Sequence, residues 1–131
     1  DAQLSRGLGD VYKRQLENGI YSMYHQQYQM ALKLFTDIIK EDPKWAEGWN
    51  KRATLLFIMG NYEKSLDDIE KVLDLEPRHF GALSGRAQIY LSYKQYEKAI
   101  DDLRKAKSIY PLIKSGENIR LIEKIIKEQQ I

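Results

Sequence analysis

Residues of the same chemical class recur every 34 positions along most of this chain. Three prolines, three tyrosines and three small residues each keep this spacing, and four further columns are apolar or small in every copy. A repeat of this length predicts stacked supersecondary units, because one unit cannot bury its own apolar face. The columns are Pro43, Pro77 and Pro111; Tyr28, Tyr62 and Tyr96; Ala31, Ser65 and Ala99; Leu32, Leu66 and Ile100; Phe35, Ile69 and Leu103; Ile38, Val72 and Ala106; Gly19, Ala53 and Ala87.

Each repeat predicts two helices joined by a turn. In the second half of a repeat, apolar residues recur at intervals of three and four, as at Leu66, Ile69 and Leu73, which is the period of an amphipathic helix and not of a strand. The tyrosine column is expected to open this second helix and to fill the wedge between the two helices. The proline column is expected to end it, because proline lacks an amide hydrogen and restricts the residue before it. The fold class is therefore all-α.

The turns differ in composition. Gly60-Asn61 occupies the turn of the middle hairpin, where the first copy has Gln26-Gln27 and the third has Lys94-Gln95. Only the middle turn uses glycine.

Five features go together with the 34-residue spacing: Trp49, the small residue, the aromatic residue, the Ala or Ser and the final proline. On these features the chain resembles tetratricopeptide repeat proteins from about Leu16 to Pro111. The stretch WAEGWNKRAT is similar to a subgroup of bacterial and plant repeat proteins, and we expect a bacterial-type member. The resemblance implies a right-handed superhelical solenoid of three helix-turn-helix hairpins, at about 12–45, 46–79 and 80–111. Two departures stand out: Arg52 and Arg86 replace the usual leucine, and Gln15 occupies the position of Trp49.

Residues 112–131 predict one further amphipathic helix, with Leu112, Ile119, Ile122, Ile125 and Ile126 on its apolar side. Stacked repeats leave an apolar face on the last hairpin, and such arrays need a terminal element with a polar outer face. A capping helix is therefore favoured over a helix that docks onto another protein.

Residues 1–15 are expected to be foreign to the protein. The letters SRGLGDVYKRQ, Ser5 to Gln15, resemble the in-frame translation of a transposon-based sequencing-library adapter, and they show no apolar period that would seat them in a helix. We therefore leave this segment out of functional reasoning. Native sequence is expected to start at about Leu16, with the true N-terminus missing.

Composition argues against several classes of function. The chain has no cysteine, which excludes disulfides, thiolate metal sites and cysteine nucleophiles and leaves the compartment open, with the cytoplasm favoured. Its apolar runs are much shorter than the roughly 20 residues of a membrane-spanning helix. The 21 basic and 19 acidic residues are interleaved, so the net charge of +2 forms no block suited to nucleic acid.

The titratable residues suggest no chemistry. His25 and His79 fall at turns or junctions of different repeats, without a carboxylate at ligand spacing, which predicts structural roles. Ser84 has no neighbouring base in the sequence pattern. We expect no enzymatic activity, no cofactor and no metal. The acidic pairs Asp67-Asp68 and Asp101-Asp102 are expected to be solvated, with salt bridges to Lys64, Lys71, Lys98 and Lys105.

The resemblance places function on the concave face, which the first helices line. Met23, Tyr24 and Ile58 are candidates for apolar anchors of a bound peptide, or they pack between repeats. The predicted peptide-binding groove comprises Ile20, Met23, Tyr24, Glu47, Asn50, Lys51, Thr54, Ile58, Gly81, Ser84, Gly85 and Gln88.

A test of one family function is possible from the sequence. Chaperone-linked members hold acidic C-terminal tails with a clamp of Lys, Asn, Asn, Lys and Arg. A single basic residue among the five positions predicts no tight binding to such tails. The positions correspond here to Leu16, Ile20, Lys51, Gly81 and Gly85.

The leading hypothesis is a scaffold or adaptor that binds a protein or peptide partner. Two alternatives stay open: a regulatory fragment of a larger protein or enzyme, and a helical-repeat RNA binder, for which Lys51, Arg52, Arg78 and Arg86 are separated by acids. We expect a monomer or weak self-association through apolar surface around Ile20 and Leu32.

Overall fold

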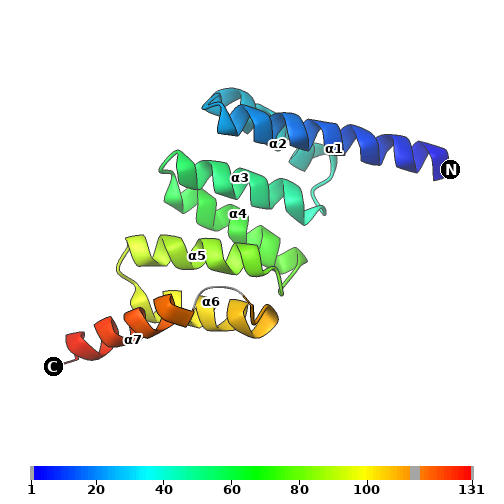
Figure 1. The fold of residues 1–131 in the computed structure, drawn as a ribbon. Coiled ribbons are helices and arrows are strands. Elements are labelled where there is room, and N and C mark those ends of the chain that lie inside the picture. The colour runs from blue at the N-terminus through cyan, green and yellow to red at the C-terminus, as the bar shows by residue number, and fades with distance from the viewer. Residues whose placement is uncertain (1, 113–115, 131) are drawn as a thin grey trace. The chain divides into compact units, whose positions relative to one another are not determined.

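The computed structural model describes the backbone of residues 2–112 and 116–130 and the side chains of residues 9–112, 116 and 118–130. Helices occupy most of this part of the chain, which contains no strand (Figure 1). They are α1 (Ala2–Tyr24), α2 (Tyr28–Glu41), α3 (Ala46–Ile58), α4 (Tyr62–Leu75), α5 (Phe80–Ser92), α6 (Tyr96–Ile109) and α7 (Gly116–Gln129).

Contacts divide the chain into two compact units, Asp1–Lys71 and Val72–Ile131. The first unit contains α1, α2, α3 and most of α4, and the second contains the end of α4 with α5, α6 and α7. Within these units, α1 pairs with α2 and α5 pairs with α6 as helical hairpins.

The tyrosine and proline columns set the ends of the second helices, as predicted. Helices α2, α4 and α6 begin at Tyr28, Tyr62 and Tyr96, and each ends two residues before a proline. The residue between has left the helical region, with ψ of 79° at Asp42 and 87° at Tyr110. This is the conformation that a following proline favours.

All three hairpin turns have the same backbone, although only one contains glycine. One residue in each turn has a positive φ, and the next amide donates a hydrogen bond of 2.8 Å to a carbonyl five residues earlier. This pattern satisfies carbonyls at the end of the first helix. The φ values are 61° at Gln26, 80° at Gly60 and 58° at Lys94, and the donor and acceptor pairs are Gln27 and Ser22, Asn61 and Leu56, and Gln95 and Tyr90.

The core of the first unit is built around the close approach of α1 and α2. A Cβ placed on Gly19 would lie 2.4 Å from Cε1 of Phe35, so only glycine fits against this fully buried ring. The small-residue column therefore has the predicted role. Ile20 and Leu32 are half-buried against the same core. Its buried members are Met23, Ala31, Phe35, Ile38 and Leu55.

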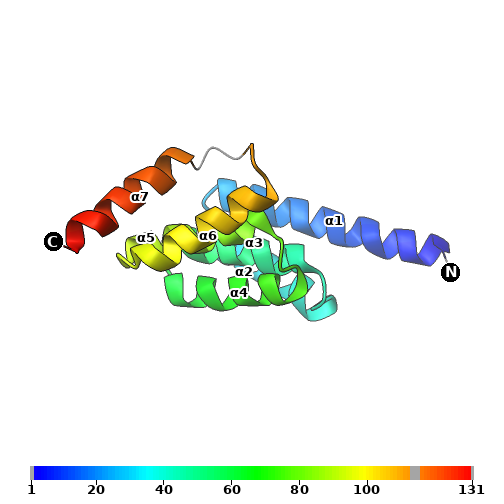
Figure 2. The same ribbon diagram turned by 90° about the horizontal axis from the view of Figure 1, so that it is seen from below.

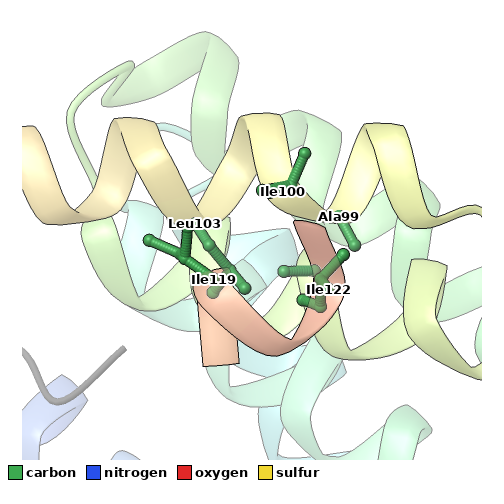
Figure 3. Packing of buried hydrophobic residues seen from close by; sticks show 6 residues of the cluster. Ala99, Ile100, Leu103, Ile119 and Ile122 are labelled. Carbon is green, nitrogen blue, oxygen red and sulfur yellow. The ribbon is translucent and has the colours of Figure 1, made fainter. Parts of the chain in front are cut away.

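In the second unit, α7 packs its apolar side on α6. Figure 3 shows Ile119 and Ile122 of α7 against Ala99 and Leu103 of α6. The helix is shorter than predicted, because α7 begins at Gly116 and Leu112 is 80% exposed in the turn before it. The placement of Leu112 on the apolar side of this helix was therefore wrong. Residues 113–115 and 131 of the predicted helix lie outside the described residues.

Helix α1 runs through the segment that resembles an adapter translation, so the expectation that this segment is not helical was wrong (Figures 1 and 2). Once Leu16–Tyr24 is helical, extension toward the N-terminus needs no new nucleus, and Lys, Arg, Gln and Leu are good helix formers. The ring of Tyr12 lies 6.4 Å from that of Trp45, whereas Val11, Lys13 and Arg14 are exposed. The adapter origin of residues 1–15 stays a prediction.

Candidate functional site

One side of α3 is directed away from its contacts with α2 and α4. Gly48 faces α2, since a Cβ there would lie 3.1 Å from Cγ2 of Ile38, and the carbonyl of Ala53 accepts a hydrogen bond of 2.7 Å from Oγ of Ser65 on α4. Five predicted groove residues, spaced at three and four, share the remaining side. Glu47, Asn50 and Lys51 are half-buried there, and Thr54 and Ile58 are exposed.

The three candidate apolar anchors of the first two repeats divide between core and surface. Met23 is 6% exposed and belongs to the core of the first unit, so the packing alternative applies to it. Tyr24 is 76% exposed and Ile58 is 46% exposed. These two residues hold the same position in successive repeats, at the C-terminal ends of α1 and α3, which contact each other. We name the surface of the first unit formed by Ile20, Tyr24, Glu47, Asn50, Lys51, Thr54 and Ile58 the first-helix surface.

The predicted groove residues of the third repeat lie on α5, in the second unit. They share one side of that helix, on which Gly81 and Gln88 are exposed and Gly85 is half-buried. The hydroxyl of Ser84 is buried and has no hydrogen-bond partner in the described part of the chain. This edge of α5 is small and polar.

The structure corrects the prediction for the acidic pairs. Asp68 and Asp102 are buried, and each accepts two hydrogen bonds from an arginine sixteen positions earlier in the chain. Arg52 binds Asp68 through Nε at 2.7 Å and Nη2 at 2.8 Å. Arg52 and Arg86, which stand where the family usually has leucine, are therefore the partners of these two aspartates. The sequence pattern could have indicated these pairs. The predicted lysine salt bridges to Asp68 and Asp102 were wrong.

The Arg52 and Asp68 pair lies in a cleft that the sequence reading missed. The cleft has a volume of about 470 Å³ and is lined by residues of α2, α3 and α4. The guanidinium of Arg52 stands 5.2 Å from the ring centre of Trp49, whose Nε1 donates a hydrogen bond of 2.8 Å to the carbonyl of Pro43. We name it the outer cleft; its lining is Leu32, Thr36, Trp49, Arg52, Leu56, Lys64, Asp67, Asp68 and Lys71.

The histidines have local partners. Nδ1 of His79 accepts a hydrogen bond of 3.0 Å from the amide of Ala82 and so caps α5, and the ring of His25 stacks on Tyr21 with centroids 3.9 Å apart. Within the described residues, no cluster of three or more histidine, cysteine or acidic side chains is suited to a metal ion. None of the described helices combines the length and apolar character that crossing a membrane requires.

Two segments of the chain match two models of one repeat family. Residues 46–79 and 81–111 each match a tetratricopeptide repeat. The chain is a tetratricopeptide repeat protein. A TPR repeat-containing protein of Rhizobium etli is 61% identical over 54 residues, which are 41% of this chain. They are only 26% of that relative, so the chain spans a minor part of its length.

Solved structures show the same tetratricopeptide fold. The first TPR of Spaghetti (RPAP3), bound to an HSP90 peptide, has a TM-score of 0.82 and 19% identity, covering 88% of this chain and 93% of that one. The type III secretion chaperone SycD of Yersinia enterocolitica, in complex with a peptide of the translocator YopD, has a TM-score of 0.81 and 13% identity, covering 93% and 96%. The prediction of an all-α tetratricopeptide solenoid is confirmed.

Proposed function

We propose that this protein is an interaction scaffold that binds a peptide segment of a protein partner on the concave side of its first helices, without catalysis. The observation that carries the proposal is the exposure of two large apolar side chains, Tyr24 and Ile58, at equivalent positions of neighbouring first helices. Burying such side chains against a partner gains about 1.5 to 3 kcal/mol each, before the cost of association.

The surroundings of these two residues suit an extended peptide. Asn50 supplies both a donor and an acceptor to a peptide backbone. The hydroxyl of Thr54 donates to the carbonyl of Asn50 at 3.0 Å, so its methyl group adds to the apolar contact area. In the second unit, Gly81, Gly85 and Gln88 lie on one side of α5, where the lack of a side chain on glycine allows a peptide backbone to approach closely. The fold of peptide-bound relatives such as SycD supports this mode of binding.

The chemistry of the partner is expected to differ from that of the acidic HSP90 peptide bound by Spaghetti (RPAP3). At the five positions of the carboxylate clamp this chain has one cation, Lys51, which cannot form the paired contacts that a terminal carboxylate needs. We expect no tight binding to such tails. Calorimetry that finds micromolar affinity for the peptide SRMEEVD would overturn this expectation.

The first experiment is a pull-down followed by mass spectrometry, with wild type and variants whose circular dichroism spectra match that of wild type. Wild type is compared with Tyr24→Ala plus Ile58→Ala and with the control Met30→Ala plus Leu121→Ala, which removes two exposed apolar side chains elsewhere. Partners lost only from the first variant support the first-helix surface. Partners retained by that variant contradict the proposal. Asn50→Ala plus Lys51→Glu tests the polar part of the same surface.

A second reading places the same module within a larger protein or enzyme. The observation that favours it is the small share of the Rhizobium etli relative, 26%, that the matching segment covers. The genomic sequence on either side of this segment decides between the two readings.

RNA binding is disfavoured because Arg52 and Arg86 are held by carboxylates. Binding that weakens steeply with salt would support RNA.

A further inference from the structure

The outer cleft lies on the opposite side of α3 from the first-helix surface. A rotation of about 100° per residue places Trp49, Arg52 and Leu56 on one side of this helix and Glu47, Thr54 and Ile58 on the other. The side chains in the cleft are therefore not shared with the peptide surface proposed above, and the inference below does not rest on it.

The inner part of the outer cleft is largely apolar. Leu32 of α2 is half-buried, Leu56 of α3 is 6% exposed, and the ring of Trp49 is half-buried beside them. The volume of about 470 Å³ falls within the range of roughly 300 to 1,000 Å³ that is typical of ligand sites. It has room for one large apolar side chain of a partner.

The charges around this apolar part are unequal. Arg52 forms a salt bridge with Asp68, and their side chains are 21% and 6% exposed. Lys64 and Lys71 stand seven residues apart on α4, or about 10 Å along the helix, and both are exposed. Neither ammonium group forms a salt bridge within the described residues. Two free ammonium groups therefore face one free carboxylate, that of Asp67.

We propose that the outer cleft is a second binding site, for a partner segment that carries a large apolar side chain flanked by acidic residues. The apolar side chain lies against Leu32, Trp49 and Leu56. Carboxylates before and after it in the partner pair with Lys64 and Lys71. The Arg52 and Asp68 pair holds α3 and α4 in place and keeps the cleft open, because its two parallel hydrogen bonds fix the distance between the helices.

A displayed library of random peptides tests this proposal. The library is selected on the full chain carrying Tyr24→Ala plus Ile58→Ala, so that the first-helix surface does not dominate the selection. Enriched peptides are then measured by anisotropy against this background, against Lys64→Glu plus Lys71→Glu, and against the control Lys105→Glu plus Lys124→Glu. The control makes the same change of charge at exposed lysines of the second unit.

The expected peptides contain an aromatic or branched apolar residue with Asp or Glu within a few positions on both sides. Their affinity falls about tenfold or more in Lys64→Glu plus Lys71→Glu, because two attractive pairs become repulsive, and it weakens with salt. The control keeps the affinity. Selection of basic or uncharged peptides, failure to enrich any peptide, or equal binding to both lysine variants would overturn the proposal.

Trp49 gives a second and independent measurement. In a Trp45→Phe background it is the only tryptophan of the chain, and it lines the cleft. An enriched peptide that enters the cleft is expected to shift its emission, because water beside the indole is displaced. Unchanged emission at saturating peptide would place the binding elsewhere and contradict the proposal.

Discussion

Arg52 on α3 and Asp68 on α4 are joined by two hydrogen bonds, from Nε to Oδ2 at 2.7 Å and from Nη2 to Oδ1 at 2.8 Å. The same pair recurs one repeat later as Arg86 and Asp102, with both distances at 2.8 Å. Each pair connects the two helices of one hairpin. The first repeat lacks it, with Asn18 and Leu34 at the equivalent positions.

The burial of these pairs determines what a substitution costs. Asp68→Asn keeps the size of the side chain but removes its charge, so Arg52 loses its counterion in a mostly buried position. We expect the free energy of unfolding to fall by roughly 3 kcal/mol, as is usual when one partner of a buried pair is removed. Urea unfolding followed by circular dichroism measures this loss.

Asp37→Asn is the matched control. Nζ of Lys33 binds Oδ2 of Asp37 at 2.8 Å, but the two side chains are 71% and 43% exposed. The hydrogen bond from Lys33 lowers the pKa of Asp37, so this carboxylate is ionised at neutral pH and the same charge is removed as in Asp68→Asn. We expect no measurable change in the unfolding midpoint, because solvent screens exposed pairs. Equal losses in the two variants would show that burial is not the cause.

Replacing both partners is expected to behave differently from replacing one. Arg52→Leu alone leaves Asp68 buried without its counterion and destabilises by about 3 to 5 kcal/mol. Arg52→Leu plus Asp68→Leu removes both buried charges and is expected to stay within about 1 kcal/mol of wild type, or to exceed it. A double-mutant cycle measures the coupling. If the double variant lost as much stability as the two single variants together, apolar side chains could not replace the pair, and this expectation would be wrong.

Helix boundaries were predictable because they depend on local chemistry. The tyrosines and prolines mark helix ends through contacts and restrictions within a few residues, and Tyr28 and Pro43 mark α2 as expected. The N-terminal part of α1 was not predictable from periodicity, since most of residues 9–15 are exposed and such a helical extension needs no apolar side. Leu112 was misplaced for a related reason: its spacing fits the apolar side, but the turn that follows Pro111 keeps it out of the helix.

The site residues were predictable only in part. Helical spacing grouped Glu47, Thr54 and Ile58 on one side of α3, but it could not separate Met23 from Tyr24, because burial depends on the neighbouring helix. The outer cleft was missed because its aspartates were paired only with lysines of the same helix, and not with an arginine of the preceding helix. The co-occurrence of arginine and aspartate sixteen positions apart in two repeats, with neither in the first, was the available signal.

The turn of the third hairpin offers a stabilising substitution. Lys94 has a φ of 58°, a conformation that costs a residue with a side chain roughly 1 kcal/mol and costs glycine very little. Lys94→Gly is therefore expected to raise the free energy of unfolding by up to about 1 kcal/mol, because the gain is reduced by the extra freedom of glycine in the unfolded chain. Thermal unfolding compares it with Gly60→Ala, which should be destabilised at a φ of 80°. Stabilisation by both substitutions would show that the positive φ does not determine their effects.

At a second glycine, Gly19, the contact with Phe35 and not the backbone conformation predicts a loss of stability on substitution. Alanine is normally favoured over glycine within a helix by about 1 kcal/mol. At Gly19, however, the added Cβ would lie 2.4 Å from Cε1 and 2.9 Å from Cδ1 of Phe35, a ring that is fully buried. Gly19→Ala is expected to lose roughly 1 to 3 kcal/mol through overpacking.

Gly9→Ala is the control in the same helix, since among the described residues nothing but its chain neighbours and its own helix backbone lies within 4 Å of the added Cβ. It is expected to be neutral or stabilising, with the difference between the two variants measured by urea unfolding. A further variant, Gly19→Ala plus Phe35→Leu, separates overpacking from any other effect at Gly19. Because leucine is smaller than phenylalanine, the alanine methyl group should cost less in the Phe35→Leu background than in wild type. The same cost in both backgrounds would show that the ring of Phe35 does not require glycine at this position.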